Sequence, residues 1–416
     1  MKLARITLAL LLALASAPAL AAEFALKDGD RVVFYGDSIT DQRLYTTFVE
    51  TFVVTRFPKS NITFVHSGWG GDRVGGGGGG PVDVRLQRDV VAYNPTVVSI
   101  MLGMNDASYR AFDKKIFDAY AKGYEHIVDT LKEKAPGVRL TLIQPSPFDD
   151  VTRKPNFDGG YNAVLIRYGD YLKELAAKKG ASVADLNTTL VMATKKAEEA
   201  DHETAVKFNQ DRVHPGPAGQ LLMAESLLKA WNAPATVSEV EIDAESGKVT
   251  NASNTTATEL KANGKISWTQ EDAALPFPIN LNDPVTALAV KSSDILDALD
   301  RQMLTVKNAK ASEYTLKIDG KDLGKFNRDQ LAAGVNLATL DTPMIQQARH
   351  VHDLTLKHNN IHFTRWRGVE VPLQGEKSAD MKAALEALDR VEASVVKDQR
   401  EAAKPKPHMY ELVPNS

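Results

Sequence analysis

The stretch Val32-Val33-Phe34-Tyr35-Gly36-Asp37-Ser38-Ile39-Thr40 decides the fold of this chain. It opens on four apolar residues that predict a buried strand, breaks at Gly36, and is followed by a helical pattern from about Asp41. A serine on such a turn lies at the carboxyl edge of a sheet, where the first N–H groups and the dipole of the helix favour negative charge. Ser38 is therefore either a nucleophile or only the N-cap of the helix.

The first half of the chain alternates short apolar runs with longer helical patterns. Five continuously apolar runs predict strands buried on both faces, as in a parallel sheet, at residues 31–35, 62–66, 96–102, 139–143 and 182–186. Helices are expected at residues 45–56, 82–93, 114–134, 161–179, 190–200 and 217–231. This alternation predicts a doubly wound α/β domain whose functional residues gather at the carboxyl ends of the strands.

Four polar loops are expected at that edge, and each supplies a different chemical group. The first carries Ser38, the second Gly70-Gly71-Asp72, the third Gly103-Met104-Asn105-Asp106, and the fourth Asp211-Arg212-Val213-His214. The Asp-x-x-His spacing lets the carboxylate hold one tautomer of the imidazole ring. Each of these residues alone has an ordinary structural interpretation, but their joint occurrence in this order is far more specific.

The four blocks resemble those of the SGNH (GDSL-like) hydrolase superfamily, over roughly residues 28–232. Gly71 matches the glycine block best, with Gly70 as a possible one-residue shift, and Ile39 stands where many members have leucine. The resemblance implies a three-layer α/β/α, flavodoxin-like fold around a parallel sheet.

The resemblance also implies a role for each residue that matches a block. Ser38 is expected to attack an ester carbonyl, His214 to accept its proton, and Asp211 to orient the imidazole and stabilise the imidazolium. The backbone N–H groups of Ser38 and Gly71 and the side-chain amide of Asn105 are expected to form the oxyanion hole. This chemistry uses neither a metal nor a cofactor, so we expect none.

Two further features lie near these loops. Trp69 and Tyr109 flank the oxyanion residues and are candidates for stacking on a sugar ring, with core packing as an equal alternative. The six glycines of residues 75–80 are followed by Pro81-Val82 rather than Lys-Ser/Thr, which excludes a phosphate cradle. We expect the glycines to let the backbone pass close to the second loop or to the substrate, and a disordered linker is the alternative.

The second half of the chain predicts a β-rich accessory region. Strands are expected at residues 237–242, 266–269 and 314–318, the last followed by an Asp-Gly turn, and helices at 343–357 and 377–402. We therefore divide the chain into a hydrolase domain (22–233), a β-rich accessory domain (234–375), and a C-terminal helix and tail (376–416). The accessory region either binds glycan or only shapes the cleft.

Four histidines in the accessory region invite a metal site: His350, His352, His358 and His362. The first two lie two residues apart on an expected helix and therefore face different ways, which argues against shared coordination.

The N-terminus reads as a secretory signal peptide of residues 1–21. Lys2 and Arg5 precede an apolar run too short to span a membrane, and Ala19-Leu20-Ala21 fits the cleavage pattern. The chain has 0 cysteines, which excludes a lipoprotein anchor and a disulfide framework. We expect a bacterial periplasmic or secreted protein without a stable membrane anchor. The formal net charge of −3 gives no basic field for nucleic acid.

Together these observations predict an exported serine esterase that hydrolyses carboxylic esters through an acyl-serine. O-acetyl groups on carbohydrate are the favoured substrate, so the expected partner is a small-molecule or polysaccharide ester. A lipase, lysophospholipase or thioesterase is the alternative, but it would need a large apolar acyl channel, and the sequence has no long apolar lid. A non-catalytic glycan-binding protein would have lost a catalytic residue, and none is missing. The oligomeric state is left open.

Overall fold

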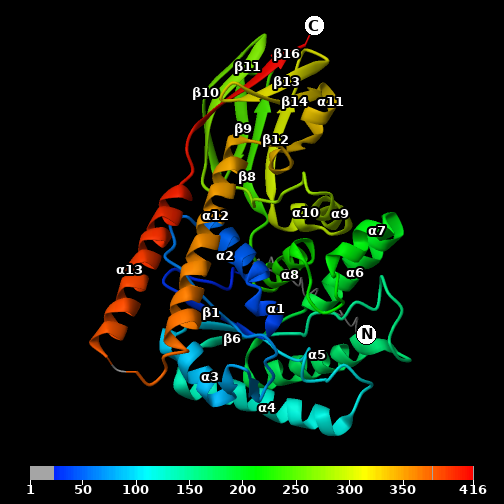
Figure 1. Cartoon of the computed structure of the whole chain (residues 1–416). Helices are drawn as coiled ribbons and strands as arrows, with labels where there is room; N and C mark the ends of the chain where they lie inside the picture. Colours follow the sequence, from blue (N-terminus) through cyan, green and yellow to red (C-terminus); the bar gives the residue numbers. More distant parts are fainter. Residues whose placement is uncertain (1–22, 377, 416) are drawn as a thin grey trace, which may run out of the picture.

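The computed structural model describes residues 23–376 and 378–415, so the predicted signal peptide lies outside the described residues. An α/β part forms one end of the molecule and a β-rich part the other, and two long helices run along the side from one to the other (Figure 1). No helix in the described part of the chain is long and apolar enough to cross a membrane.

The α/β part is built on a five-stranded parallel sheet in the order β2-β1-β5-β6-β7, which is the doubly wound order expected of a flavodoxin-like fold. Its strands are β1 (Arg31–Gly36), β2 (Thr63–Gly68), β5 (Val97–Met101), β6 (Arg139–Ile143) and β7 (Ser182–Ala184). The strands β1 and β5 at the centre are buried almost throughout, because both faces are covered by helices. The predicted fold class is confirmed.

Helices cover both faces of this sheet. On one side α2 (Leu44–Arg56) packs on α8 (Pro217–Ala230), and α8 packs on α6 (Leu186–Ala200). On the other side α4 (Lys114–Lys134) packs against both α3 (Val82–Asp89) and α5 (Gly160–Lys179). Two short helices, α1 (Ser38–Asp41) and α7 (His202–Ala205), complete the set.

The β-rich part contains two sheets, in the orders β10-β11-β16-β13-β14 and β15-β12-β8-β9. The first consists of β10 (Thr255–Asn263), β11 (Lys265–Asp272), β13 (Glu313–Ile318), β14 (Lys321–Asn327) and β16 (His408–Pro414). The second consists of β8 (Thr236–Asp243), β9 (Lys248–Ser253), β12 (Arg301–Lys307) and β15 (Val335–Asn336). Three short helices accompany them: α9 (Pro284–Ser292), α10 (Ile295–Leu299) and α11 (Arg328–Ala333).

Strand β16 was not predicted, and it lies in the middle of its sheet. It pairs antiparallel with β11 on one side and with β13 on the other. Tyr410 and Leu412 are its buried positions, and they alternate with more exposed neighbours as the period of a strand requires.

The remaining two helices form a hairpin that leaves the β-rich part, lies along the α/β part and returns (Figure 1). Helix α12 (Pro343–Phe363) packs on α2 and continues as a π-helical turn, Thr364–Glu370. Helix α13 (Ala379–Ala402) packs on α12 and leads into β16.

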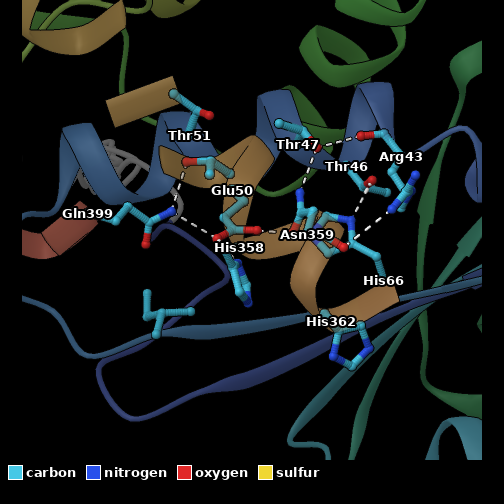
Figure 2. Close-up of polar contacts among 12 residues, drawn as sticks. Arg43, Thr46, Thr47, Glu50, Thr51, His66, His358, Asn359, His362 and Gln399 are labelled. Atoms are coloured by element: carbon cyan, nitrogen blue, oxygen red, sulfur yellow. Dashed lines mark hydrogen bonds and ion pairs between the residues drawn. The ribbon is translucent and has the colours of Figure 1, made fainter. Parts of the chain in front are cut away.

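The hairpin is joined to the α/β part by a buried polar cluster around Glu50 of α2 (Figure 2). One carboxylate oxygen of Glu50 lies 2.9 Å from His358 Nδ1 and accepts a hydrogen bond of 3.0 Å from Gln399 Nε2. Its other oxygen lies 2.9 Å from Nε2 of His66, on β2, and His358 Nε2 lies 3.1 Å from a Glu392 carboxylate oxygen. A single buried carboxylate therefore connects α2, β2, α12 and α13.

Charge explains why this cluster is stable. Burial disfavours a charged His358, but the carboxylates of Glu50 and Glu392 outweigh it and raise the pKa of His358 to about 10. Burial alone would raise the pKa of Glu50, but the contacts with His358 and His66 lower it by more. The Glu50 carboxyl therefore stays ionised. Burial lowers the pKa of His66 to about 4, which leaves that ring neutral at pH 7. A protonated His358 thus lies between two carboxylates.

The link between the two parts of the chain is also fixed, by Arg56 at the end of α2. Its guanidinium donates to the carbonyl of Pro234 at 2.6 Å and to the carbonyl of Leu299 at 2.7 Å, and it lies 3.8 Å from the Asp300 carboxylate. Because Arg56 and Asp300 are both buried, the segment between α8 and β8 is held against the end of α2.

Candidate active site

The three predicted loops that follow strands meet at one edge of the parallel sheet. β1 is the neighbour of both β2 and β5, so Ser38, Gly71 and Asn105 follow three adjacent strands. The fourth loop, which carries Asp211 and His214, leads into α8 and reaches the same edge.

Asp37, and not Ser38, caps the first helix. The Asp37 carboxylate accepts a hydrogen bond of 3.0 Å from the backbone N–H of Ile39, and Ser38 is the first helical residue. Burial raises the pKa of Asp37 to about 7, and the Ile39 N–H offsets only part of this effect. With the cap supplied by Asp37, the hydroxyl of Ser38 is left to interact with His214.

The Ser38, His214 and Asp211 side chains form one hydrogen-bonded chain. His214 Nε2 lies 2.8 Å from Ser38 Oγ, and His214 Nδ1 lies 2.7 Å from Asp211 Oδ2. The other carboxylate oxygen of Asp211 accepts hydrogen bonds from the backbone N–H groups of Val213 and His214, at 2.9 and 2.7 Å. Burial raises the pKa of Asp211, but these bonds and the ring outweigh it and hold the pKa below its usual value. The ionised carboxylate of Asp211 can only accept a hydrogen bond, so the proton of the neutral His214 ring lies on Nδ1. Nε2 is then unprotonated and can accept the proton of Ser38.

A strained turn holds Asp211 and His214 in place. Arg212, between them, has φ 74, in the left-handed region that costs a non-glycine residue about 1–3 kcal/mol. Its guanidinium donates to the Asp149 carbonyl at 2.9 Å and to an Asp150 carboxylate oxygen at 2.7 Å, and its own carbonyl accepts from Asp149 N–H at 2.9 Å. These bonds offset the strain and fix the loop.

The amide of Asn105 is held from two sides. Its Nδ2 donates to the Asp72 carbonyl at 3.0 Å, and its Oδ1 accepts from the Tyr109 hydroxyl at 3.0 Å. An amide nitrogen carries two N–H groups, and only one of them is used here. Because both ends of the amide are held, the remaining N–H keeps a fixed direction. Gly71 has φ 77, a backbone conformation that favours glycine.

The structure gives the two candidate aromatic residues different environments. Tyr109 is 43% exposed, stacks on Tyr161 with ring centroids 5.0 Å apart, and has φ 55, next to Ser108 with φ 61. Its hydroxyl is the partner of Asn105, a positioning contact that the sequence did not indicate. Trp69 is only 9% exposed and has the guanidinium of Arg367 3.2 Å from its ring centroid, which favours core packing over sugar stacking.

A buried ion network supports the second loop from behind. Arg85 Nε donates to an Asp72 carboxylate oxygen at 2.7 Å, and Arg85 also pairs with Asp89. Asp89 accepts a hydrogen bond of 2.6 Å from the indole N–H of Trp366, in the π-helical turn after α12. All four side chains are buried, so the C-terminal hairpin is part of the support of this loop.

A second contact from the same turn reaches the front of the loop. Arg367 Nη1 lies 3.6 Å from an Asp41 carboxylate oxygen, and the other oxygen of Asp41 accepts from the Gly70 N–H at 3.1 Å. Arg367 and Asp41 were not predicted as site residues. Nothing in the local sequence marks them, because the contact joins positions far apart in the chain.

The glycine run forms a small β-hairpin, β3 (Gly76–Gly77) with β4 (Gly80–Pro81). A Cβ atom at Gly79 would lie 2.6 Å from the Trp69 ring and 2.6 Å from Arg85. The backbone can therefore approach the second loop this closely only because the residue is glycine. This favours the close-approach interpretation over a disordered linker.

In residues 23–376 and 378–415, no group of three or more His, Asp or Glu side chains is arranged to hold a metal ion. Two of the four histidines considered for a metal, His358 and His362, lie instead 3.1 and 3.5 Å from a carboxylate oxygen of Glu392. Figure 2 labels both histidines.

The chain is similar to several known proteins. Residues 34–222 match the GDSL-like Lipase/Acylhydrolase family. An acetylxylan esterase of Geobacillus stearothermophilus is 25% identical over 219 residues, which are 48% of this chain and 93% of that protein. A solved structure of a gut microbial diltiazem-metabolizing enzyme has a TM-score of 0.80 at 25% identity and covers 94% of this chain and 98% of its own.

These matches identify the class of the protein, which is a carboxylic ester hydrolase. Residues 34–222 form a domain of the GDSL-like lipase/acylhydrolase (SGNH) family, as the four sequence blocks predicted. The acetylxylan esterase matches about half of this chain, whereas the diltiazem-metabolizing enzyme matches almost all of it, accessory region included.

Proposed function

We propose that Ser38, His214 and Asp211 hydrolyse esters through an acyl-serine intermediate. The observation that carries this proposal is the chain of contacts of 2.8 and 2.7 Å from Ser38 through His214 to Asp211. Ser38 Oγ attacks the ester carbonyl while His214 Nε2 takes its proton. His214 then gives that proton to the leaving alcohol, and water attacks the acyl-serine with His214 again as the base.

The negative charge that forms on the carbonyl oxygen needs donors that already point at it. We assign this role to the backbone N–H groups of Ser38 and Gly71 and to the free N–H of Asn105. Loss of one such donor costs about 2.7–4 kcal/mol of transition-state stabilisation.

The substrate that we propose is a short acyl ester on carbohydrate, with O-acetyl as the acyl group. Its support is the match to an acetylxylan esterase along about half of this chain. We also propose export to the periplasm or medium, which rests on the leader pattern of residues 1–21.

The test of the mechanism is the Ser38→Ala variant, assayed on p-nitrophenyl acetate and on acetylated xylan. We expect both activities to be lost with the melting temperature unchanged. Ser253→Ala, an exposed serine on β9, is the matched control and should keep full activity. A Ser38→Ala protein within about tenfold of wild type would exclude the serine mechanism.

Acyl length tests the substrate assignment. Each methylene buried in a true acyl tunnel would gain about 0.8 kcal/mol. We therefore expect kcat/KM to fall from acetyl to decanoyl p-nitrophenyl esters. A steady rise along this series would favour the lipase alternative.

A further inference from the structure

A groove of about 700 Å³ lies between the hydrolase domain and the accessory region. One wall comes from α2, the start of α8 and the segment before it, and includes Phe48 and Gln210. The other wall comes from residues 278–286 and from α12, and includes Asn280, His352 and Asp353. Neither part of the chain could form this groove alone.

The groove begins beside the proposed catalytic loop. Gln210 immediately precedes Asp211, and Pro217, which also lines the groove, follows His214 by three residues. Three residues of chain span at most about 11 Å, so Pro217, at this end of the groove, lies within that distance of the backbone of His214.

Flat apolar surface and hydrogen-bonding groups occur together in the groove. The rings of Phe48 and His352 stack with centroids 5.4 Å apart and planes at 15°, and His352 Nδ1 lies 3.0 Å from the Thr51 hydroxyl. Gln210, Asn280 and Asp353 are exposed and supply amide and carboxylate groups. Pyranose rings are recognised by this combination, with an apolar face on an aromatic ring and hydroxyls on polar side chains.

The charges of the lining balance one another. Lys207 and Arg349 contribute two positive charges, and Asp283 and Asp353 two negative charges. Burial lowers the pKa of His352, so this ring adds no charge at pH 7. With no net field of either sign, the groove suits a neutral, hydroxyl-rich chain better than a phosphorylated or acidic one.

We propose that this groove binds the sugar units next to the acetylated one, on the alcohol side of the scissile ester. The proposal rests on the proposed esterase function and gives the accessory region a role in substrate recognition. The groove takes no part in the bond-breaking steps, so its contribution lies in binding an oligomeric substrate and not a small ester.

The test is a pair of groove variants, Asn280→Trp, which fills the groove from its exposed edge, and Asp353→Ala, which removes a polar contact on α12. Each is assayed on acetylated xylo-oligosaccharides and on p-nitrophenyl acetate. We expect the ratio of the two kcat/KM values to fall about tenfold or more in Asn280→Trp, mostly through a higher KM for the oligosaccharide. Asn251→Trp, on the exposed face of β9, is the matched control and should leave the ratio unchanged.

Binding without turnover separates this proposal from the catalytic one. Titration calorimetry with non-acetylated xylo-oligosaccharides should show binding to the wild type and to Ser38→Ala and weaker binding to Asn280→Trp. Binding without ester hydrolysis in the wild type would refute the esterase mechanism but support the groove. An unchanged activity ratio in both groove variants, or no binding by the wild type, would overturn the groove proposal.

Discussion

At Asn105, one side-chain amide is fixed by two partners, and this is the smallest unit on which the proposed chemistry depends. The Asp72 carbonyl takes one N–H and the Tyr109 hydroxyl donates to the amide oxygen, each at 3.0 Å. Both Ser108 and Tyr109 have a left-handed backbone, which costs about 1–3 kcal/mol each, so the loop accepts strain to bring the hydroxyl to the amide.

Tyr109→Phe tests this unit. The variant keeps the ring but loses the hydroxyl, so the Asn105 amide can rotate away from the oxyanion. We expect kcat on p-nitrophenyl acetate to fall about tenfold, or ~1.4 kcal/mol, with little change in KM. Tyr171→Phe is the control, because it loses a hydrogen bond of 2.8 Å to the Ala121 carbonyl on the outer helices. An unchanged kcat would leave Tyr109 without a role in positioning Asn105.

At the scale of the elements, the π-helical turn after α12 braces the second loop at two points. Trp366 reaches Asp89 behind the loop, and Arg367 reaches Asp41 at the front. Because Asp41 in turn accepts from the Gly70 N–H, a change in the hairpin is passed to the backbone next to Gly71.

Arg367→Ala removes the front contact. We expect kcat and kcat/KM to fall together, about tenfold, since a misplaced Gly71 N–H weakens only the transition state. Arg365 lies in the same turn but pairs with Asp389 at 2.6 Å instead of with the loop. The control variant Arg365→Ala should therefore keep the kcat of the wild type. Equal kinetics in the two variants would show that Arg367 does not position the loop.

The cluster around Glu50 predicts how the hairpin responds to pH. The pKa of His358 is 6.5 in a free chain and about 10 in the folded protein. The stability that its charge supplies is therefore complete below pH 6.5 and is lost as the pH rises from 6.5 to 10, by up to about 1.4 kcal/mol per unit.

His358→Gln tests this dependence. At pH 7 we expect it to melt well below the wild type, because it leaves the buried carboxylate of Glu50 and the half-buried carboxylate of Glu392 without their cation, at a cost of about 3–5 kcal/mol. Between pH 7 and 9, however, it should lose less stability than the wild type does. Calorimetric melting at pH 7, 8 and 9 measures both effects, with His350→Gln, an exposed histidine on the same helix, as control. Parallel pH curves for the wild type and His358→Gln would contradict the assignment of charge to His358.

At the scale of the whole molecule, two attachments join the two parts of the chain, in addition to the packing of α9 on α6, α7 and α8. One attachment is the segment held by Arg56, and the other is the hairpin docked through Glu50. Each attachment contains charged groups buried at the contact, and both would have to open before either part could unfold alone.

We therefore expect one cooperative unfolding transition for the whole protein. The check is differential scanning calorimetry at pH 7, in which the calorimetric and van't Hoff enthalpies should agree. Two resolved transitions would show that the β-rich part and the α/β part unfold independently.

The sequence was most informative where its pattern is local. Continuous apolar runs located all five parallel strands, and residues 114–134 and 139–143 match α4 and β6 at both ends. The four blocks predicted which residues meet at the sheet edge, because the carboxyl ends of parallel strands are brought together by the fold itself.

What the sequence could not indicate depends on distant contacts. Strands β9 and β10 were missed because their residues are polar and mostly exposed, so no apolar alternation marks them. Arg367 and His358 gain their roles only from partners on other elements. The sequence around Trp69 likewise does not indicate whether its ring contacts a ligand or, as here, the guanidinium of Arg367.

The central place of β16 has a consequence for how the protein is best produced. Its residue Glu411 contacts Lys265 of β11 across 146 positions of sequence, so this pairing closes a long loop of the chain. Until β16 is in place, β11 and β13 face each other across an empty position, and each presents an open edge to other chains. Refolding from denaturant should therefore give its best yield at high dilution, and a peptide of residues 408–414 added in excess should reduce aggregation.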